Sequence, residues 1–296
     1  MQSPEAHRYV SQRLSLNYYD FGNPLAPPLI LLHGGRDHGR SWDRVAERLR
    51  ARWHILAPDL RGHGDSQWSL DGNYGLTSYV FDLAELVHQR GFAPVNLIGH
   101  SLGGNIATRF AGIFPDQVRR LVSIEGLGPA PKILAERAMN PMTERLRGWI
   151  EAQRALASRR PRRYEQLADA LARMQEANRR LSPEQANHLT QHGVKRNEDG
   201  TYSWKFDPSL HVFSPVDLSS AEIEQLWAQV ACPTLLVYGR DSWASNPLTD
   251  GRARHFKNAR VVMAEKAGHW VQHDRIDFFI DTVEAFLADE PNSNQL

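Results

Sequence analysis

The sequence predicts an α/β fold in which a mostly parallel, doubly wound sheet carries an inserted helical segment. Short apolar runs, typical of strands buried on both faces, alternate with amphipathic runs at helical spacing. The alternation stops near residue 129 and resumes near residue 231, with roughly a hundred residues of helical spacing between them. We therefore expect a core domain formed by residues 1–128 and 231–296, and a helical insertion formed by residues 129–230.

The first part of the chain predicts an edge hairpin, two buried strands and a helix. Residues 8–21 alternate polar with aromatic or aliphatic side chains and end at Gly22-Asn23-Pro24, which is typical of a hairpin at a sheet edge. Residues 28–32 and 54–58 each predict a strand of the sheet. Between these two strands, the apolar residues of 41–49 recur at the spacing of a helix with one buried face.

The same alternation continues on both sides of the insertion. Before it, residues 80–87 and 104–114 predict helices, and residues 95–98 and 121–124 predict strands. After it, the expected elements are strands at 234–238 and 260–264 and a closing helix at 276–287. Because strand and helix alternate in this way, the connections are those of a parallel sheet with helices on both faces.

Composition and charge exclude several classes of partner. The 296 residues include 41% hydrophobic and 23% charged side chains, which is typical of a soluble globular protein, and the net charge of +1 provides no field for nucleic acid. We interpret the basic run at 159–163 as a solvated surface. No apolar run approaches the roughly 20 residues of a membrane span. Cys232 is the only cysteine, so no intrachain disulfide can form, and we expect a cytoplasmic protein without a cofactor.

One serine has the sequence context of a nucleophile. Gly99-His100-Ser101-Leu102-Gly103 joins the strand at 95–98 to the helix that begins near Gly104. A serine in such a tight turn from strand to helix has its hydroxyl exposed at the sheet edge, and the flanking glycines let strand and helix pack closely. The pattern therefore predicts nucleophilic catalysis by Ser101.

Four short motifs resemble the landmarks of a known superfamily. In chain order they are His33-Gly34-Gly35, Asp59-Leu60-Arg61-Gly62-His63-Gly64, Gly99-His100-Ser101-Leu102-Gly103-Gly104 and Gly268-His269-Trp270. Together they resemble the serine hydrolases of the α/β-hydrolase superfamily, in the esterase-like branch with a helical cap, across nearly the whole chain. The resemblance implies the α/β-hydrolase fold, with the insertion in the usual place of the cap.

The resemblance also implies roles for four residues. A neutral serine hydroxyl needs a base to remove its proton, and His269 occupies the position of that base. The backbone N–H groups of Gly35 and Leu102 occupy the positions that stabilise the negative oxygen formed when Ser101 attacks a carbonyl.

A metal pair formed by His269 and His273 would need a third ligand at matching spacing, so we expect no metal.

The acid that orients His269 has two candidates. Most of the superfamily carries this acid in a Gly-x-x-Asp motif after the seventh strand, but here that spacing reaches Ser242, and Asp241 comes one residue early. A shift of one residue along an extended loop turns the side chain to the other side. Glu125, at the end of the preceding strand, is the position that other branches use. We favour Glu125 and keep Asp241 as the alternative.

Four aromatic residues of the insertion are candidates for the substrate pocket. Tyr202, Trp204 and Phe206 alternate with polar residues, so an extended segment places them on one face. Together with Trp149 they predict a pocket wall, and packing within the insertion is the alternative interpretation.

The predicted activity is carboxylic ester hydrolysis through an acyl-serine intermediate on a small to medium, partly apolar ester. A serine at this turn argues against epoxide hydrolases and haloalkane dehalogenases, which attack with a carboxylate. The alternatives are a cofactor-independent perhydrolase, a carbon–carbon bond hydrolase with the same triad, and a non-catalytic ligand receptor. We expect a small-molecule ester as the partner, and the sequence predicts no oligomeric state.

Overall fold

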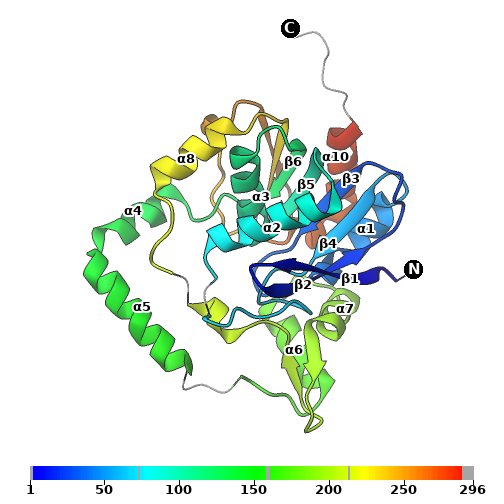
Figure 1. Cartoon of the computed structure of the whole chain (residues 1–296), viewed down its shortest axis with the longest axis vertical. Helices are drawn as coiled ribbons and strands as arrows, with labels where there is room; N and C mark the ends of the chain where they lie inside the picture. Colours follow the sequence, from blue (N-terminus) through cyan, green and yellow to red (C-terminus); the bar gives the residue numbers. More distant parts are fainter. Residues whose placement is uncertain (1–2, 73, 158–160, 213, 289–296) are drawn as a thin grey trace.

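An eight-stranded sheet forms the centre of the computed structural model, which describes residues 3–72, 74–157, 161–212 and 214–288 (Figure 1). The strands lie in the order β1-β2-β4-β3-β5-β6-β9-β10. Their bounds are Glu5–Ser11 (β1), Leu14–Asp20 (β2), Pro28–Leu32 (β3), His54–Pro58 (β4), Val95–His100 (β5), Val118–Ile124 (β6), Thr234–Gly239 (β9) and Ala259–Ala264 (β10). The strands from β4 to β10 pair in parallel, and β1 and β2 form the antiparallel edge hairpin. The predicted mostly parallel sheet is confirmed.

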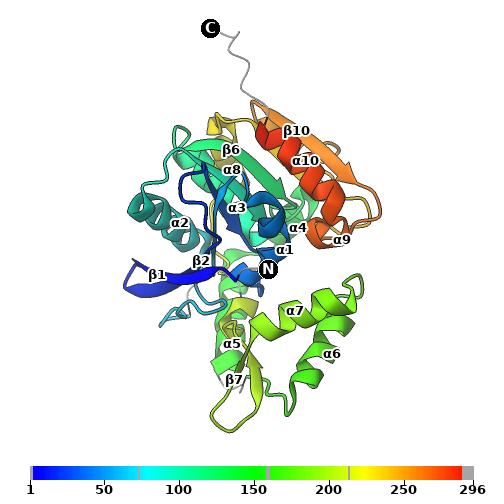
Figure 2. The ribbon, with the colours of Figure 1, turned by 90° about the vertical axis from the view of Figure 1, so that its right-hand side faces the viewer.

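Helices cover both faces of this sheet, and Figure 2 shows α2 and α10 on opposite sides of it. The helices that complete the core are η1 (Gly39–Trp42), α1 (Asp43–Leu49), α2 (Leu76–Arg90), α3 (Leu102–Ile113), η3 (Arg252–His255), α9 (Val271–Asp274) and α10 (Ile276–Ala288). Successive strand residues face opposite sides, so Ile30 and Leu32 pack with α2 and α3, while Leu29 and Leu31 pack with α1 and α10. Burial on both faces explains why these strands are continuous apolar runs.

Most of the predicted insertion, including α5, α6, α7 and β7, lies outside the sheet and its covering helices (Figures 1 and 2). Its elements are α4 (Pro131–Met139), α5 (Met142–Ala157), α6 (Leu167–Ala177), α7 (Pro183–Gly193), β7 (Val194–Arg196), β8 (Tyr202–Trp204), η2 (Pro208–His211) and α8 (Ser220–Gln229). Helix α8 packs on α3 of the core. The two backbones are so close that a Cβ at Gly112 would lie 2.3 Å from the carbonyl oxygen of Leu226. The boundaries at 129 and 230 stay a prediction.

The insertion contains a two-stranded antiparallel sheet, β7 with β8, where the sequence predicts almost no strand. Lys195 and Arg196 of β7 are exposed, so the short strand carries no alternation of polar and apolar residues. Pairing with β8 stabilises it, and that pairing is a tertiary contact. Of the extended segment predicted from Tyr202 to Phe206, β8 covers Tyr202 to Trp204, and the chain bends at 205 and 206.

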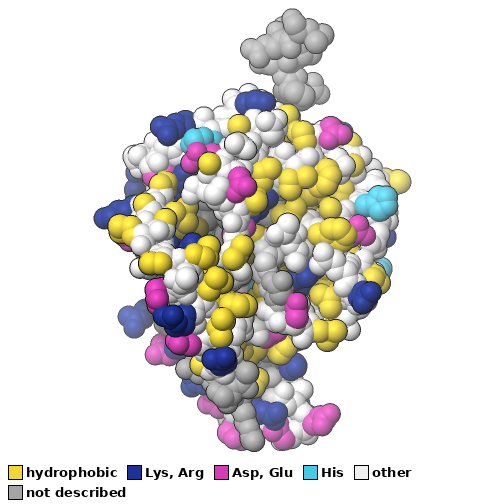
Figure 3. All heavy atoms as spheres, turned by 60° about the vertical axis from the view of Figure 1, so that its left-hand side comes forward, with side chains coloured by type: hydrophobic (Ala, Val, Ile, Leu, Met, Phe, Trp, Pro, Cys, Tyr) yellow, Lys and Arg dark blue, Asp and Glu magenta, His cyan; other side chains and the backbone are white. Residues whose placement is uncertain are grey.

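Helices α4 and α5 present many apolar side chains to solvent, and Figure 3 shows hydrophobic side chains gathered on the face where these helices lie. The exposed members include Ile133, Met139, Met142, Leu146 and Ile150. Of the basic run, Arg159 and Arg160 lie outside the described residues. Among the described helices, none has both the length and the apolar character that a bilayer crossing requires.

Candidate active site

The predicted catalytic side chains follow neighbouring parallel strands at the same edge of the sheet. Ser101 follows β5, Glu125 follows β6, Asp241 lies after β9, and His269 lies after β10. The carboxyl ends of adjacent parallel strands meet at one edge, so four segments far apart in the sequence converge there. This edge of an open α/β sheet is where such folds bind their ligands.

Ser101 lies in a strained turn between β5 and α3. Its φ of 52° and ψ of −112° lie outside the helical and extended regions, and its N–H donates to the carbonyl of Ile124 at 2.8 Å. A Cβ at Gly99 would lie 2.4 Å from the carbonyl oxygen of Gly103, and a Cβ at Gly103 would lie 2.3 Å from that of Leu32. Only glycine fits these two positions, so they allow the strand and helix to approach as the motif predicts.

Glu125 contacts His269 directly. Its Oε2 accepts a hydrogen bond from His269 Nδ1 at 2.5 Å, and the residue is only 5% exposed. Two further donors hold the carboxylate: the N–H of Gly239 at 2.8 Å to Oε1, and Ser242 Oγ at 2.6 Å to Oε2. Since Nδ1 donates to a carboxylate, the lone pair of His269 lies on Nε2, which can accept a proton.

His100 connects the segment that carries Ser101 to His269. Its Nε2 hydrogen-bonds to the backbone carbonyl of His269 at 3.0 Å, and the two ring centroids lie 4.8 Å apart. Burial and the neighbouring His269 keep the pKa of His100 well below its usual range, so the ring is neutral and can donate only through this Nε2–H. Sequence analysis missed this contact, although His100 stands next to Ser101 in the motif.

Asp241, the alternative acid, pairs with Arg180, whereas His269 pairs with Glu125. The carboxylate of Asp241 forms an ion pair with Arg180 at 3.0 Å, and about half of each side chain is exposed. Its N–H donates to the carbonyl of Ala267 at 2.9 Å. The one-residue shift in the loop therefore turns Asp241 toward Arg180, and the position that faces Glu125 holds Ser242. The geometry does not support the alternative assignment.

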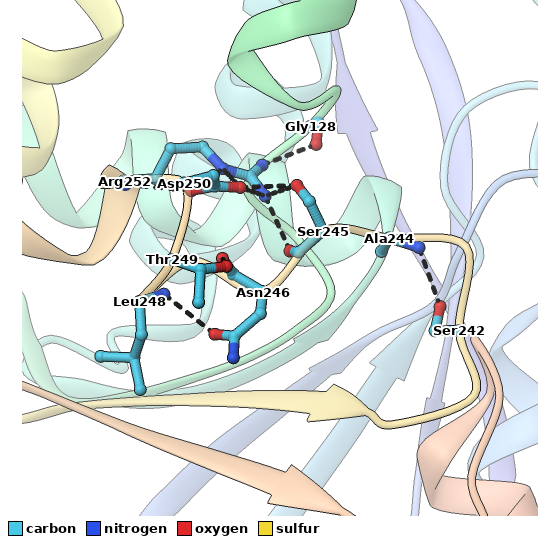
Figure 4. A network of polar contacts seen from close by, with 9 residues as sticks. All are labelled: Gly128, Ser242, Ala244, Ser245, Asn246, Leu248, Thr249, Asp250 and Arg252. Carbon is cyan, nitrogen blue, oxygen red and sulfur yellow. Dashed lines mark hydrogen bonds and ion pairs between the residues drawn. The ribbon is translucent and has the colours of Figure 1, made fainter.

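A buried arginine joins the loop that carries Ser242 to the loop that follows Glu125 (Figure 4). Arg252, which is 4% exposed, pairs with Asp250 at 2.7 Å and donates to the carbonyl oxygens of Ser245 and Gly128 at 3.0 and 2.9 Å. Hydrogen bonds to a charged donor are among the stronger ones in proteins. This network therefore holds the two loops in one arrangement around the carboxylate of Glu125.

We expect Ser242→Ala to lower kcat about tenfold with little change in KM. The variant removes one of three donors to Glu125, a charge-assisted bond of about 1.5–3 kcal/mol, and leaves the carboxylate less well oriented toward His269. Steady-state kinetics on an activated ester measures this. Thr249→Ala is the matched control, because Thr249 lies in the same loop and its hydroxyl donates only to the exposed carbonyl of Asn246 at 3.0 Å. Equal losses of kcat in the two variants would contradict a positioning role for Ser242.

The predicted oxyanion-binding groups belong to two segments that lie next to Ser101. A Cβ at Gly34 would be 3.4 Å from Ser101 Cβ, so the loop after β3 runs beside the serine, and the position of a Cβ at Gly35 has no heavy atom within 4 Å. Leu102 is the first residue of α3, where backbone N–H groups have no intrahelical acceptor. Both N–H groups thus belong to segments that border Ser101.

The loop before Gly35 is held by His33. Its Nε2 accepts from the N–H of Leu60 at 2.9 Å, its Nδ1 contacts the carbonyl of Gly34 at 2.7 Å, and its own carbonyl accepts from Gly103 N–H at 3.1 Å. Burial keeps the pKa of His33 well below its usual range, which suits an imidazole with one donor and one acceptor nitrogen. The sequence motif contains His33, but only the contacts reveal this function.

A cavity between the core and the insertion is lined in part by Arg36 and Trp270, the residues that follow Gly35 and His269 in the sequence. Its lining includes Arg36, His38, Met174, Trp204, Phe206 and Trp270. Trp204 and Phe206, with ring centroids 6.2 Å apart, were predicted for the pocket wall. The lining does not include Tyr202, which packs in the apolar cluster of Tyr164, or Trp149, which is half-buried on α5. Alternation along a strand predicts which rings share a face, but it does not predict which rings line a cavity shared with the rest of the chain.

The comparisons with known proteins agree with this fold. Residues 27–276 match the family model described as alpha/beta hydrolase fold, and the chain belongs to this family. Esterase Rv0045c of Mycobacterium tuberculosis is 30% identical over 272 residues, which cover 88% of this chain and 83% of the esterase. The sn-1-specific diacylglycerol lipase ABHD11 of mouse is 27% identical over 296 residues, which cover 93% and 85%.

A solved structure extends the likeness to the fold as a whole. The hypothetical protein PA1622 of Pseudomonas aeruginosa PAO1 superposes with a TM-score of 0.83 at 28% identity, over 96% of this chain and all of that one. The family and these relatives support hydrolase activity for the chain, and they leave the class of substrate open.

Proposed function

We propose that this hydrolase is a carboxylic ester hydrolase in which Ser101 is the nucleophile, His269 the general base and Glu125 the acid that orients His269. The hydrogen bond between His269 Nδ1 and Glu125 Oε2 at the edge that carries Ser101 is the observation that supports it most. A buried carboxylate on Nδ1 selects the tautomer with a free Nε2 and stabilises the imidazolium that forms during the reaction.

In the proposed reaction, Ser101 Oγ attacks the ester carbonyl while His269 Nε2 takes the hydroxyl proton. The resulting oxyanion is stabilised by the N–H groups of Gly35 and Leu102, each worth about 3–4 kcal/mol in such sites. His269 then donates its proton to the departing alcohol, which leaves an acyl-serine. Water, activated by the same imidazole, attacks this acyl group and releases the carboxylic acid and Ser101.

The structural support for the oxyanion site comes from two different segments. Leu102 begins a helix of twelve residues, and the positive end of its dipole favours a negative charge beside Ser101. Gly35 is exposed, and the space at its Cβ position lets a substrate approach the backbone closely. Both groups are backbone donors, so substitution of side chains would underestimate their contribution.

We further propose that the acyl group is small to medium and partly apolar. The cavity beside the site combines the rings of Trp204, Phe206 and Trp270 with the thioether of Met174, and it also contains the polar side chains of Arg36 and His38. An esterase and a lipase among the relatives support an ester as the reacting group.

A panel of chromogenic esters with graded acyl lengths tests this function. We expect turnover with a burst of alcohol release, since acylation and deacylation are separate steps, and covalent labelling by a fluorophosphonate. No turnover with any ester, together with no labelling, would overturn the proposal. Stabilisation by esters without hydrolysis would indicate a non-catalytic receptor. Activity confined to peracid formation would indicate a perhydrolase, and activity confined to carbon–carbon cleavage would indicate a carbon–carbon bond hydrolase.

A further inference from the structure

A second group of polar side chains lies between the core and the cap. Asp43 begins α1 of the core, and His188 and His192 lie four residues apart on α7 of the cap. Each of the three offers one ligand atom, and these atoms all lie within 4.8 Å of one another. We call these three residues the cap–core cluster. None of them belongs to the proposed triad or to the predicted oxyanion site.

The cluster has the donor set and spacing of a transition-metal site. Histidines at positions i and i+4 lie on the same face of a helix, and Zn²⁺ accepts two imidazoles and a carboxylate with a water molecule as fourth ligand. The ligand atoms around a tetrahedral zinc at about 2.1 Å lie roughly 3.4 Å apart. To bind such an ion, the three ligand atoms need to approach their common centre by about 1 Å. His188 and His192 are half-buried, so small changes in their side-chain torsions allow this movement.

A buried imidazole adjoins the cluster. The ring of His38 lies 6.4 Å from that of His192 and donates from Nε2 to the carbonyl of Leu189 at 3.0 Å. Its Nδ1 is buried and has no hydrogen-bond partner within the described chain. The rings of His188 and His192 are themselves 4.7 Å apart. The junction thus places the imidazoles of His38, His188 and His192 near the carboxylate of Asp43.

Arg40 is the native competitor for a metal at this place. Its guanidinium donates to both oxygens of Asp43 at 2.6–2.9 Å, and its backbone carbonyl accepts from His188 Nε2 at 3.0 Å. A cation that binds Asp43 must therefore displace or share this ion pair. The competition predicts a moderate affinity in the native chain and a higher affinity once the guanidinium is removed.

We propose that Asp43, His188 and His192 bind a divalent transition metal of the zinc type, which joins α7 of the cap to α1 of the core. Leu189 lies between the two histidines on α7 and lines the cavity beside the proposed active site. Metal bound to His188 and His192 therefore ties one wall of that cavity to the core. The expected consequences are a higher Tm and slower exchange of substrate and product.

Titration of the metal-free chain with ZnCl₂ by isothermal calorimetry, together with Co²⁺ absorption spectroscopy, tests the site. We expect one saturable site and the visible bands of tetrahedral Co²⁺. His192→Gln should weaken Kd at least ~10-fold, because it removes a ligand. His88→Gln, at an exposed histidine of α2, is the matched control and should keep the wild-type affinity. Circular dichroism without metal establishes that both variants are folded.

Arg40→Met provides an independent arm of the experiment. This variant removes the competing guanidinium and should tighten Zn²⁺ binding. If the cluster only joins the cap to the core through ion pairs, we expect a lower Tm and no gain in Zn²⁺ affinity. The proposal is overturned by the absence of saturable binding, by equal affinities in His192→Gln and wild type, or by unchanged or weaker binding in Arg40→Met. These readouts do not depend on ester hydrolysis, so the proposed function stands or fails separately.

Discussion

Alanine in place of Ser101 is expected to lower kcat by about 10⁴- to 10⁶-fold, since removal of a nucleophile leaves only the contribution of binding and of the oxyanion site. The backbone strain at Ser101 is the same for serine and alanine, so Tm should stay within a degree or two of the wild-type value. Single-turnover kinetics with an activated ester and thermal unfolding measure both quantities.

The control for this variant is a serine outside the site. Ser209 is half-buried in η2, and Ser209→Ala should keep both turnover and fluorophosphonate labelling. Labelling that survives in Ser101→Ala, or turnover within tenfold of wild type, would show that another residue carries the acyl group and would contradict the proposed mechanism.

Glu125→Gln is expected to lower kcat by about 10³- to 10⁴-fold. An uncharged amide cannot stabilise the imidazolium of His269, and its NH₂ group favours the tautomer in which Nδ1 is the acceptor and Nε2 carries the proton. The N–H of Gly239 can still donate to the amide oxygen, but an NH₂ group in place of Oε2 reverses the hydrogen bonds to His269 and Ser242, and all three bonds lose their charge assistance. Some loss of Tm should accompany the loss of activity.

Asp241→Asn is the matched control, because it changes the same kind of group at the alternative position. The variant loses only a half-exposed ion pair with Arg180, and such pairs contribute about 0–1 kcal/mol, so kcat should change less than about twofold. The pH profile of kcat/KM should be measured for both variants. A perturbed general base changes the shape of this profile, whereas partial unfolding lowers activity at every pH. A large effect of Asp241→Asn with a small effect of Glu125→Gln would reverse the assignment.

Much of the fold could be predicted because its signals are local. Strands buried on both faces require unbroken apolar runs, and β3, from Pro28 to Leu32, has the predicted bounds. The capping box at Ser182 and Gln185 marks the start of α7, where both reciprocal hydrogen bonds are present. Strand β7 could not be predicted, because its three residues have no periodicity and depend on pairing with β8.

Some parts of the candidate site could likewise be predicted from local sequence, and others could not. The turn that carries Ser101 is encoded by glycines within two residues of it, so the sequence is sufficient to find it. The choice between Glu125 and Asp241 depends on the direction of each side chain in a loop, and a shift of one position reverses that direction. The lining of the cavity likewise depends on how the insertion packs against the sheet and its helices.

The sequence by itself determined the order of strands and helices and the positions of Ser101 and His269, because periodicity and turn chemistry act over a few neighbouring residues. Only the tertiary structure decided that Glu125 meets His269 across 144 residues of chain, that Trp204 reaches the cavity, and that Asp43 meets His188 and His192. These contacts join segments that are far apart in the sequence, and separation along the chain does not predict the distance between two residues in the folded protein. Packing of the sheet and the cap brings them together.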